Sequence, residues 1–455
     1  MNRLKLQNGS RIAIIGGGPA GVFTAHFLRK YLAERDKEAS ITIFDGKDFL
    51  LPGPKGCNLC AGVLSDSLSQ KLAEEGIVLP DSRIVNRVEG YVLHVHDEQI
   101  EFSFFDNQIM PISTVFRGNG PRCSNFPDVV SFDDYLLAWV QRMGVAVISQ
   151  PVWDIAIPGQ SMDPVRLIYG KKNTTQSCEA DFVVGAFGIN SFLSKKIQAG
   201  GFGYRPPPAL ITYQAEILMG MDEIRKSFAN NIHVYVPRSK IIRYASVIPK
   251  GDYVSLTVIG KKDLDKEMLS SFADLGELHR KIPLDKPACF CFPRIAVSPA
   301  RNPFTDRFVI VGDASFSRHY KNGIESAFVT AQLAAQTVTE SGVDSKSFSS
   351  VYLKRARRKI ISDNHYGRLL LKINDIITSS LLLTRAQISL IKDKKRKNIA
   401  KKLRFILWNM FTGNISYKEI FKAAFDMKLQ WALLKNIVKS AFAKGRDPSR
   451  LAGHE

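Results

Sequence analysis

The stretch "RIAIIGGGPAGVFTAHFL", residues 11–28, decides the fold. It opens with a short apolar strand, continues through three glycines in G-x-G-x-x-G spacing, and runs into an amphipathic helix. The first glycine permits a tight turn, the second lets the backbone approach a pyrophosphate, and the third lets helix and strand pack closely. The candidate residues of this phosphate-binding turn are Gly16, Gly18, Pro19, Ala20 and Gly21.

The next predicted strand, "ITIFD" (residues 41–45), ends in Asp45, 24 positions beyond Gly21. An acidic residue at that place can accept hydrogen bonds from ribose hydroxyls. A glycine triplet alone would also fit a glycine-rich turn in another α/β protein. Strand, triplet, helix, strand and terminal acid in this order are a much more specific pattern. We therefore expect an α/β fold that begins with a Rossmann-like nucleotide-binding unit.

The length and composition indicate a folded protein of more than one domain. A chain of 455 residues can form two or three domains with their own cores. It contains no run of 18 or more uncharged apolar residues, which a membrane-spanning helix would need. The first apolar run is interrupted by glycines, so we interpret it as the βα unit and not as a signal peptide. Six cysteines at irregular spacing do not resemble a secreted disulfide framework, and we expect a cytoplasmic, reduced protein.

The positive charge is concentrated at the C-terminal end. The chain has a formal net charge of +20, and residues 341–455 contain 25 Lys and Arg against 8 Asp and Glu, a net of +17. The first 340 residues are therefore nearly neutral. This asymmetry predicts that the C-terminal region meets an anionic partner.

A second motif follows about 270 residues later, in "RFVIVGDASFSRHYKNGIESAFVTAQLAAQTV" (residues 307–338). A strand runs into Gly312-Asp313-Ala314, and a long helix begins near Gly323. Together with the glycine triplet, this resembles the FAD-dependent oxidoreductases of the para-hydroxybenzoate hydroxylase and geranylgeranyl reductase group. The resemblance implies that Gly312 and Asp313 contact FAD, with Asp313 on the ribityl chain. It also implies that the helix start at Gly323 and Ile324 faces the flavin pyrimidine edge. The alternative role for Asp313 is a helix cap.

A third match, "DFVVGAFGINSFL" (residues 181–193), lies where this group usually has a strand followed by "GADGxxS". Phe187 occupies the place of the aspartate, which in the hydroxylases helps to organise FAD and the reduced nicotinamide. We therefore expect FAD as the cofactor and leave NADPH, ferredoxin and quinol open as electron donors.

Two further segments resemble the geranylgeranyl reductases in particular. "PKGCNLCAGVLS" (residues 54–65) is similar to their "P-x-x-C-G-G-G-L-S", although Ala61 and Val63 replace two glycines. "RYASVIPKGDYVSLTVIG" (residues 243–260) is similar to their "Y-G-W-x-F-P-K-G-D" strand pair. The resemblance implies that Cys60 is catalytic beside the flavin, that Gly62 contacts the cofactor, and that Cys57, Tyr244 and Pro249 lie at the substrate pocket.

The two loop cysteines admit other interpretations. They could form a redox disulfide, or a metal site together with Cys289 and Cys291, although the family has no metal and zinc prefers C-x₂₋₄-C pairs. A compact loop against the flavin, with Cys60 as a wall residue, is the interpretation we favour. In the nearby "FRGNGPR" (residues 116–122), Arg117 or Arg122 is the candidate for the basic residue that the family often places before the helix beneath FAD.

The central segment predicts a sheet over the flavin, with strands near 209–217, 232–236, 242–248 and 252–260. Tyr213, Tyr235 and Tyr244 are candidate pocket residues; the alternative is ordinary sheet packing. His319, just after the GDA motif, is a candidate proton donor and catalytic residue, or else a surface-loop histidine.

The C-terminal region predicts basic amphipathic helices. "KDKKRKNIAKKLRFILWNMF" (residues 392–411) and "YKEIFKAAFDMKLQWALLKNIVKSAF" (residues 417–442) mix lysines with apolar residues at helical spacing. With Trp408 and Trp431 they suit the surface of an anionic membrane. The alternative is that they pack onto the FAD-binding domain and expose a solvated basic face. We find no nucleic-acid motif and expect no nucleic-acid partner.

These observations predict an α/β protein of three parts. They are a Rossmann-like FAD-binding domain (1–85, 126–200 and 296–340), an inserted antiparallel β-sheet substrate domain (86–125 and 201–295), and a basic C-terminal helical region (341–455). The resemblance implies a flavoprotein oxidoreductase of lipid metabolism that reduces double bonds of an isoprenoid lipid or quinone chain at the inner membrane face. The alternatives are an FAD-dependent monooxygenase or halogenase, a dehydrogenase that passes electrons to a quinone or carrier protein, and a non-enzymatic flavoprotein.

Overall fold

The predicted N-terminal βαβ unit forms the centre of a six-stranded sheet in the computed structural model, which describes residues 4–103, 111–158, 163–171, 173–320 and 323–444. The strand order is β20-β21-β12-β1-β2-β8, and all neighbours are parallel except β20 and β21. The strands are β1 (Ser10–Ile15), β2 (Ala39–Phe44), β8 (Ala146–Ile148), β12 (Phe182–Gly185), β20 (Phe304–Thr305) and β21 (Phe308–Ile310). The two motif-bearing strands, β1 and β21, thus lie in one sheet, with β12 between them.

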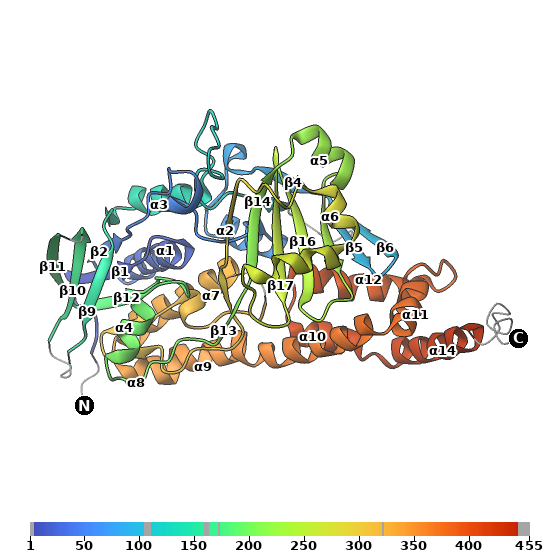
Figure 1. Cartoon of the computed structure of the whole chain (residues 1–455). Helices are drawn as coiled ribbons and strands as arrows, with labels where there is room; N and C mark the ends of the chain where they lie inside the picture. The colour runs from blue at the N-terminus through green and yellow to red at the C-terminus, as the bar shows by residue number, and fades with distance from the viewer. Residues whose placement is uncertain (1–3, 104–110, 159–162, 172, 321–322, 445–455) are drawn as a thin grey trace, which may run out of the picture.

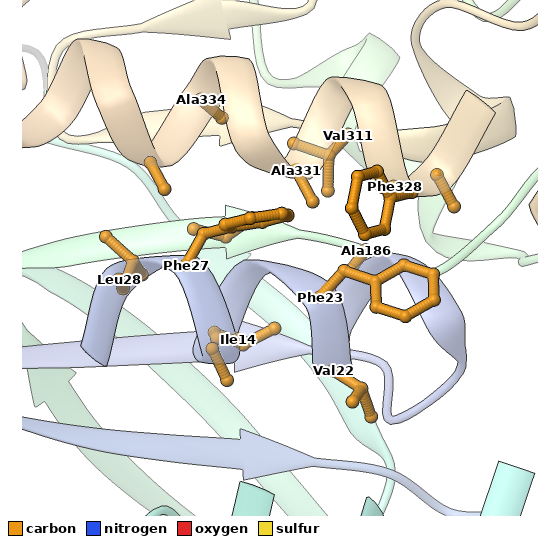
Figure 2. Close-up of a cluster of buried hydrophobic side chains, with 14 of the residues drawn as sticks. Ile14, Val22, Phe23, Phe27, Leu28, Ala186, Val311, Phe328, Ala331 and Ala334 are labelled. Atoms are coloured by element: carbon orange, nitrogen blue, oxygen red, sulfur yellow. The ribbon is translucent and has the colours of Figure 1, made fainter. Parts of the chain in front are cut away.

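Helix α1 (Pro19–Ala33) packs against helix α7 (Gly323–Glu340), and α3 (Phe132–Arg142) contacts α1 as well. Figure 2 shows the aromatic centre of this packing, where Phe23 and Phe27 of α1 meet Phe328 of α7. The ring centroids of Phe23 and Phe328 are 5.3 Å apart and those of Phe27 and Phe328 are 5.1 Å apart, both edge to face. This buried cluster fixes the first glycine motif relative to the GDA motif.

A second, seven-stranded sheet has the order β18-β14-β17-β16-β15-β5-β6. Its strands are β5 (Gly90–Val95), β6 (Glu98–Ser103), β14 (Tyr213–Leu218), β15 (Asn231–Val236), β16 (Ile242–Lys250), β17 (Tyr253–Gly260) and β18 (Cys289–Cys291). The strands predicted near 232–236, 242–248 and 252–260 are confirmed, whereas the strand predicted near 209–217 divides into β14 of this sheet and a short strand, Ala209–Ile211, that pairs elsewhere. The predicted antiparallel arrangement is wrong at one pair, because β15 and β5 run parallel. These two strands come from separate inserted segments, so no hairpin joins them.

Smaller elements complete the two sheets. A three-stranded antiparallel sheet lies beside α4 (Leu193–Ala199), and the short strands β3, β7 and β4 form another, with α2 (Asp66–Glu74) between β3 and β4 in the chain. One face of the seven-stranded sheet packs against α5 (Met221–Phe228) and the segment that contains α6 (Glu277–Lys281). The remaining strands are β3 (Val63–Leu64), β4 (Asn86–Val88), β7 (Ile112–Thr114), β9 (Val152–Ala156), β10 (Val165–Lys171), β11 (Thr174–Ala180), β13 (Ala209–Ile211) and β19 (Arg294–Ala296).

The C-terminal region spans both sheets and is not a separate unit (Figure 1). Its first part contributes Phe348 and Tyr352 to the core of the Rossmann-like domain. Its later helices contribute Leu370, Leu403 and Trp408 to a second core, on the face of the seven-stranded sheet that α5 and α6 do not cover. The helices are α8 (Ser345–Ser347), α9 (Lys354–Ala356), α10 (Asp363–Ser379), α11 (Leu381–Ile391), α12 (Lys397–Thr412), α13 (Tyr417–Ala424) and α14 (Met427–Lys444).

The prediction that Trp408 meets a membrane is wrong. Its side chain is 3% exposed and packs edge to face on Tyr91 of β5, with ring centroids 5.6 Å apart. The alternative, packing onto the FAD-binding domain alone, also needs correction, because α10 to α14 pack mainly on the other sheet. Among the described residues, no helix is both long enough and apolar enough to cross a membrane.

Candidate active site

The glycine turn after β1 has the close contacts that its sequence predicted. Gly16 has a φ of +111°, and a Cβ added there would lie 2.5 Å from the carbonyl oxygen of Ala186. A Cβ added to Gly21 would lie 1.8 Å from the carbonyl oxygen of Gly16. Gly18 is the N-cap of α1 and provides no side-chain cap, and Pro19 and Ala20 begin the helix. In the first turn, Pro19 has no N–H and the Gly21 amide donates to the carbonyl of Gly18 (3.0 Å), so the Ala20 amide and the positive end of the helix are what this turn offers to an anionic group.

Asp45 follows β2, as predicted, and its carboxylate holds the glycine turn. One oxygen accepts a hydrogen bond from the Gly17 amide (2.5 Å), and the other accepts one from the Lys47 amide (2.7 Å). Burial raises the pKa of Asp45 above its usual value. A ribose hydroxyl at this place would donate to a carboxylate that already accepts hydrogen bonds from two backbone amides.

The GDA motif lies against the first turn of α1. Gly312 has a φ of +69°, and a Cβ added there would lie 2.9 Å from the Cβ of Ala20. The Oδ1 atom of Asp313 is buried and has no hydrogen-bond partner among the described residues. Its other oxygen lies at the start of α7, 2.9 Å from where a Cβ on Gly323 would be. Because an unpaired buried carboxylate oxygen is costly, this atom fits a ligand hydroxyl better than a helix cap alone.

We call the glycine turn, Asp45 and the GDA motif together the cradle. The cysteine loop, residues 54–65, connects this cradle to the rest of the site. Asn58 donates a hydrogen bond to Asp133 of α3 and lies against Gly18. Gly62 has a φ of +66°, and its carbonyl accepts a hydrogen bond from the Val115 amide (2.8 Å). The loop is thus held between the glycine turn and the strand β7 region.

Arg117 is buried and forms a two-point ion pair with Asp133. Its Nε and Nη2 atoms donate to the two carboxylate oxygens over 2.7 and 2.9 Å. Burial disfavours the charged guanidinium, but Asp133 outweighs this and holds the pKa of Arg117 above its usual value. Arg117 is therefore occupied by the protein and orders the loop. Sequence reasoning did not single out Asp133, although it is the first acid in "SFDDY" (residues 131–135) at the start of a predicted helix.

Both loop cysteines are free thiols. Burial raises the pKa of Cys57, which favours the neutral thiol over a reactive thiolate. Cys60 lies within hydrogen-bonding reach of Arg117 and packs against the core of the Rossmann-like domain. No group of three or more His, Cys, Asp or Glu side chains in the described part of the chain is placed to hold a metal ion.

An apolar cavity of about 330 Å³ lies between the seven-stranded sheet and the C-terminal helices. Ala61 and Val63 of the cysteine loop reach its wall, and so does Tyr320, which follows the GDA motif. Alternate residues of each strand line it, since their side chains share one face of the sheet. The other lining residues include Tyr91, Leu93, Val95, Ile232, Val234, Val236, Tyr244, Ser246, Ile248, Ile377, Ile388, Met410 and Phe411.

Of the three tyrosines predicted at a substrate pocket, Tyr244 lines this cavity and the other two do not. Tyr213 and Tyr235 face the opposite side of the sheet, where Tyr213 packs edge to face on Phe272 and Tyr235 stacks on His94. Pro249 and Cys57 are not among the residues that line the cavity either. The carbonyl of Pro249 accepts a hydrogen bond from Thr114 (3.2 Å), so Pro249 joins β16 to the small sheet that contains β7.

Among the described residues that line the cavity, Arg243 is the charged one, and sequence reasoning missed it. The guanidinium of Arg243 is 3.3 Å from Asp375 of α10 and lies over the ring of Tyr320, 5.3 Å from its centroid. The Nε atom of Arg243 is buried without a hydrogen-bond partner in the described chain. The arrangement places a neutralised cation, and not an anion-binding cluster, at this wall.

His319 is buried, and it does not line the cavity. Burial, with a contribution from Arg368, lowers its pKa to about 4. The imidazole is therefore neutral near pH 7, which contradicts the prediction that it is a ready proton donor. Its amide donates to Asn364 (2.9 Å), so the residue fixes the loop after the GDA motif.

Lys250 is a second charged group that the sequence analysis did not assign. Its side chain is 1% exposed, and Nζ lies 3.7 Å from a carboxylate oxygen of Glu216. Ser255 donates to the same carboxylate (2.7 Å). A Cβ added to Gly62 would be 3.3 Å from Nζ, so this ion pair adjoins the cysteine loop.

Comparison with known proteins agrees with this architecture. No model of a known protein family matches the chain. It is 24% identical to the chloroplastic geranylgeranyl diphosphate reductase of Nicotiana tabacum, over 72% of this chain and 66% of that protein. It is 27% identical to the geranylgeranyl diphosphate reductase of Synechocystis, over 45% of this chain and 52% of that protein. The chain thus spans about half to two thirds of the length of these relatives.

Solved structures show the same fold at low sequence identity. A geranylgeranyl bacteriochlorophyll reductase-like protein from Thermoplasma acidophilum has a TM-score of 0.64 and 17% identity, over 96% of this chain and all of that one. A flavin-dependent brominase has a TM-score of 0.62 and 15% identity, over 91% and 98% of the two chains. The fold is therefore that of the flavin-dependent reductases, halogenases and monooxygenases. Within it, the predicted resemblance to the geranylgeranyl reductases is confirmed by the sequence relatives.

Proposed function

We propose that the chain is an FAD-dependent oxidoreductase that reduces carbon–carbon double bonds of an isoprenoid chain. One observation carries the proposal: the cysteine loop contacts the glycine turn through Asn58 and also supplies Ala61 and Val63 to the wall of an apolar cavity. A cofactor in the cradle and a hydrocarbon chain in the cavity would therefore meet at this loop. The size of the cavity is within the range of small-molecule sites.

The described residues fit FAD. The first turn of α1 would bind the pyrophosphate, and the unpaired Oδ1 atom of Asp313 would accept a hydrogen bond from a ribityl hydroxyl. When bound and reduced, FAD supplies a hydride, and the other alkene carbon then needs a proton. The protein's own residues orient the chain and exclude water, since the sheet and helices that line the cavity are mostly apolar.

The cavity also bears on the substrate class. The guanidinium of Arg243 is paired with Asp375, and the described lining residues include no cluster of free cations for a diphosphate. We propose that a neutral isoprenoid chain, in a lipid or a quinone, occupies the cavity. Such substrates reside in bilayers, so the enzyme would act at a membrane surface. The electron donor stays open among NADPH, ferredoxin and quinol, and an electron-carrier protein is one candidate partner.

The test is anaerobic, with the bound flavin reduced chemically so that no natural donor is needed. Adding a geranylgeranyl lipid or a polyprenyl quinone should reoxidise the flavin and yield a product with fewer double bonds. Ile377→Trp, which fills the cavity from α10, should abolish this reoxidation and retain flavin. The matched control is Ile376→Trp, the same change at a neighbouring residue that is 61% exposed, and it should behave like the wild type.

The competing function is a monooxygenase or halogenase, because such enzymes share the fold. Flavin that stays reduced with every isoprenoid substrate until oxygen is admitted, followed by a hydroxylated or halogenated product, would replace our proposal with that function. Equal rates in the Ile377→Trp and Ile376→Trp variants would show that the chain does not bind in this cavity.

A further inference from the structure

Helix α14 has an apolar face with no protein partner in the described chain. Met427, Trp431, Leu434 and Val438 are 82, 59, 52 and 46% exposed. Their spacing of four, three and four residues places them in one row along the helix, which we call the α14 stripe. Monomeric soluble proteins rarely expose large apolar side chains in such a continuous row.

The stripe is not the face by which α14 packs on the protein. Leu429, Ala432 and Asn436 form that face and are buried. The side-chain amide of Asn436 donates to the carbonyl of Ala386 in α11 (2.7 Å), which holds the two helices together. The helix is thus already anchored, and the stripe is a second apolar face (Figure 1 shows α14 at the end of the helical region).

A row of lysines runs beside the stripe. Lys428, Lys435 and Lys439 are exposed, and they directly follow three of the four stripe residues, so they flank the stripe along one side of the helix. Nζ of Lys435 lies 5.1 Å from the ring centroid of Trp431. The helix has no acidic residue of its own, and the nearby Asp426 is paired with Lys402 (2.8 Å).

We propose that the α14 stripe docks on the surface of an anionic lipid bilayer. The apolar row would enter the interfacial region, and the lysines would meet anionic headgroups, as in peripheral amphipathic helices. A second copy of the chain fits less well, because a symmetric contact through the stripe would bring two lysine rows together without acids to pair them. Helix α11, which packs against the buried face of α14, supplies Thr384, Gln387 and Ile388 to the cavity, so docking would bring lipid within one helix of the cavity.

The test uses the full-length flavoprotein and does not depend on its substrate. Wild type is floated with vesicles of phosphatidylcholine containing about 30 mol% phosphatidylserine, and with vesicles of phosphatidylcholine alone. We expect binding that is about tenfold or more tighter on the anionic vesicles and that weakens with salt. Replacing the three lysines by glutamine should remove this preference.

The stripe itself is tested by the double variant Trp431→Glu with Leu434→Glu, which should bind anionic vesicles about tenfold or more weakly. The matched control is Val78→Glu with Leu218→Glu, which removes two apolar side chains that are 65 and 57% exposed elsewhere. Flavin content and circular dichroism report whether each variant is folded. If the double variant does not fold, depth-dependent quenching of wild-type tryptophan fluorescence by brominated lipids decides the question.

Three results would overturn the inference: no binding of wild type to either vesicle, equal loss in the stripe and control variants, or a wild-type dimer that the stripe variant dissociates without any vesicle binding. None of these needs the reductase reaction. A failure here would leave the proposed function standing, and a failure of the anaerobic assay would leave the docking surface standing.

Discussion

At the scale of single residues, Asp313 gives the sharpest link between sequence and cofactor. Its Oδ1 atom is buried and has no hydrogen-bond partner in the part of the chain that the structure describes, and burial raises the pKa of the Asp313 carboxyl. We predict that Asp313→Ala weakens FAD binding about tenfold to a hundredfold, because a hydrogen bond to a charged group is worth about 1.5–3 kcal/mol. Asp313→Asn, which keeps one acceptor oxygen, should lose less. An unchanged Kd for FAD in the alanine variant, measured by flavin fluorescence, would remove the assigned role.

The properties of single residues could be predicted from the sequence where a motif fixes the local backbone conformation. The motifs alone predict the strain or crowding at Gly16, Gly21 and Gly312, because at each position another part of the chain comes so close that a side chain would clash. The neutral state of His319 could not be predicted in this way. It depends on burial by residues that are distant in the sequence, and no local pattern records that burial.

At the scale of elements, the cysteine loop is a rigid connector and not a flexible cover. A Cβ added to Gly62 would lie 2.1 Å from the carbonyl oxygen of Val115, and the residue has a left-handed φ. We predict that Gly62→Ala lowers the free energy of unfolding by about 1–3 kcal/mol. Because the cysteine loop lies between the cradle and the cavity, the Gly62→Ala variant should also retain less flavin. Urea denaturation with a flavin assay tests both, and wild-type values would mean that the loop adapts freely. Gly188→Ala is a suitable control, since it has a similar φ of +70° and open space around it.

The faces of the predicted elements were harder to assign than the elements themselves. The strands were found from their apolar alternation, but alternation does not say which face another layer covers. Tyr213 and Tyr235 were therefore placed on the wrong side of a correctly predicted sheet. The same ambiguity affected the tail, where Trp408 packs on the sheet and Trp431 is exposed although both occur in basic amphipathic helices.

At the scale of the whole molecule, buried histidines predict how stability depends on pH. His94 and His233 are 3.0 Å apart through their ring nitrogens, and burial lowers the pKa of each from 6.5 to about 4. Between those values the unfolded chain binds more protons than the folded one. The histidines therefore lower the free energy of unfolding as pH falls from 6.5 towards 4, by up to about 1.4 kcal/mol per pH unit for each.

Buried Asp45 and Asp313 have raised pKa values and contribute with the opposite sign, so a variant is needed to isolate the histidines. His233→Gln retains an amide that can donate to the carbonyl of Phe228, which the ring nitrogen of His233 contacts in the wild type (3.1 Å). The difference in unfolding free energy between wild type and this variant should change across pH 6.5 to 4. A constant difference in urea denaturation over that interval would contradict the assignment.

The position of the tail has a consequence for how such a protein can diversify. The cradle motifs lie before residue 340, whereas the roof of the cavity comes from one contiguous stretch between Asp363 and Tyr417. Recombination or insertion within that stretch can remodel the volume above the sheet and leave the glycine turn and the GDA motif untouched. The helical half of the cavity lining is thus encoded apart from the two glycine-containing motifs, and natural selection can alter this half while preserving those motifs.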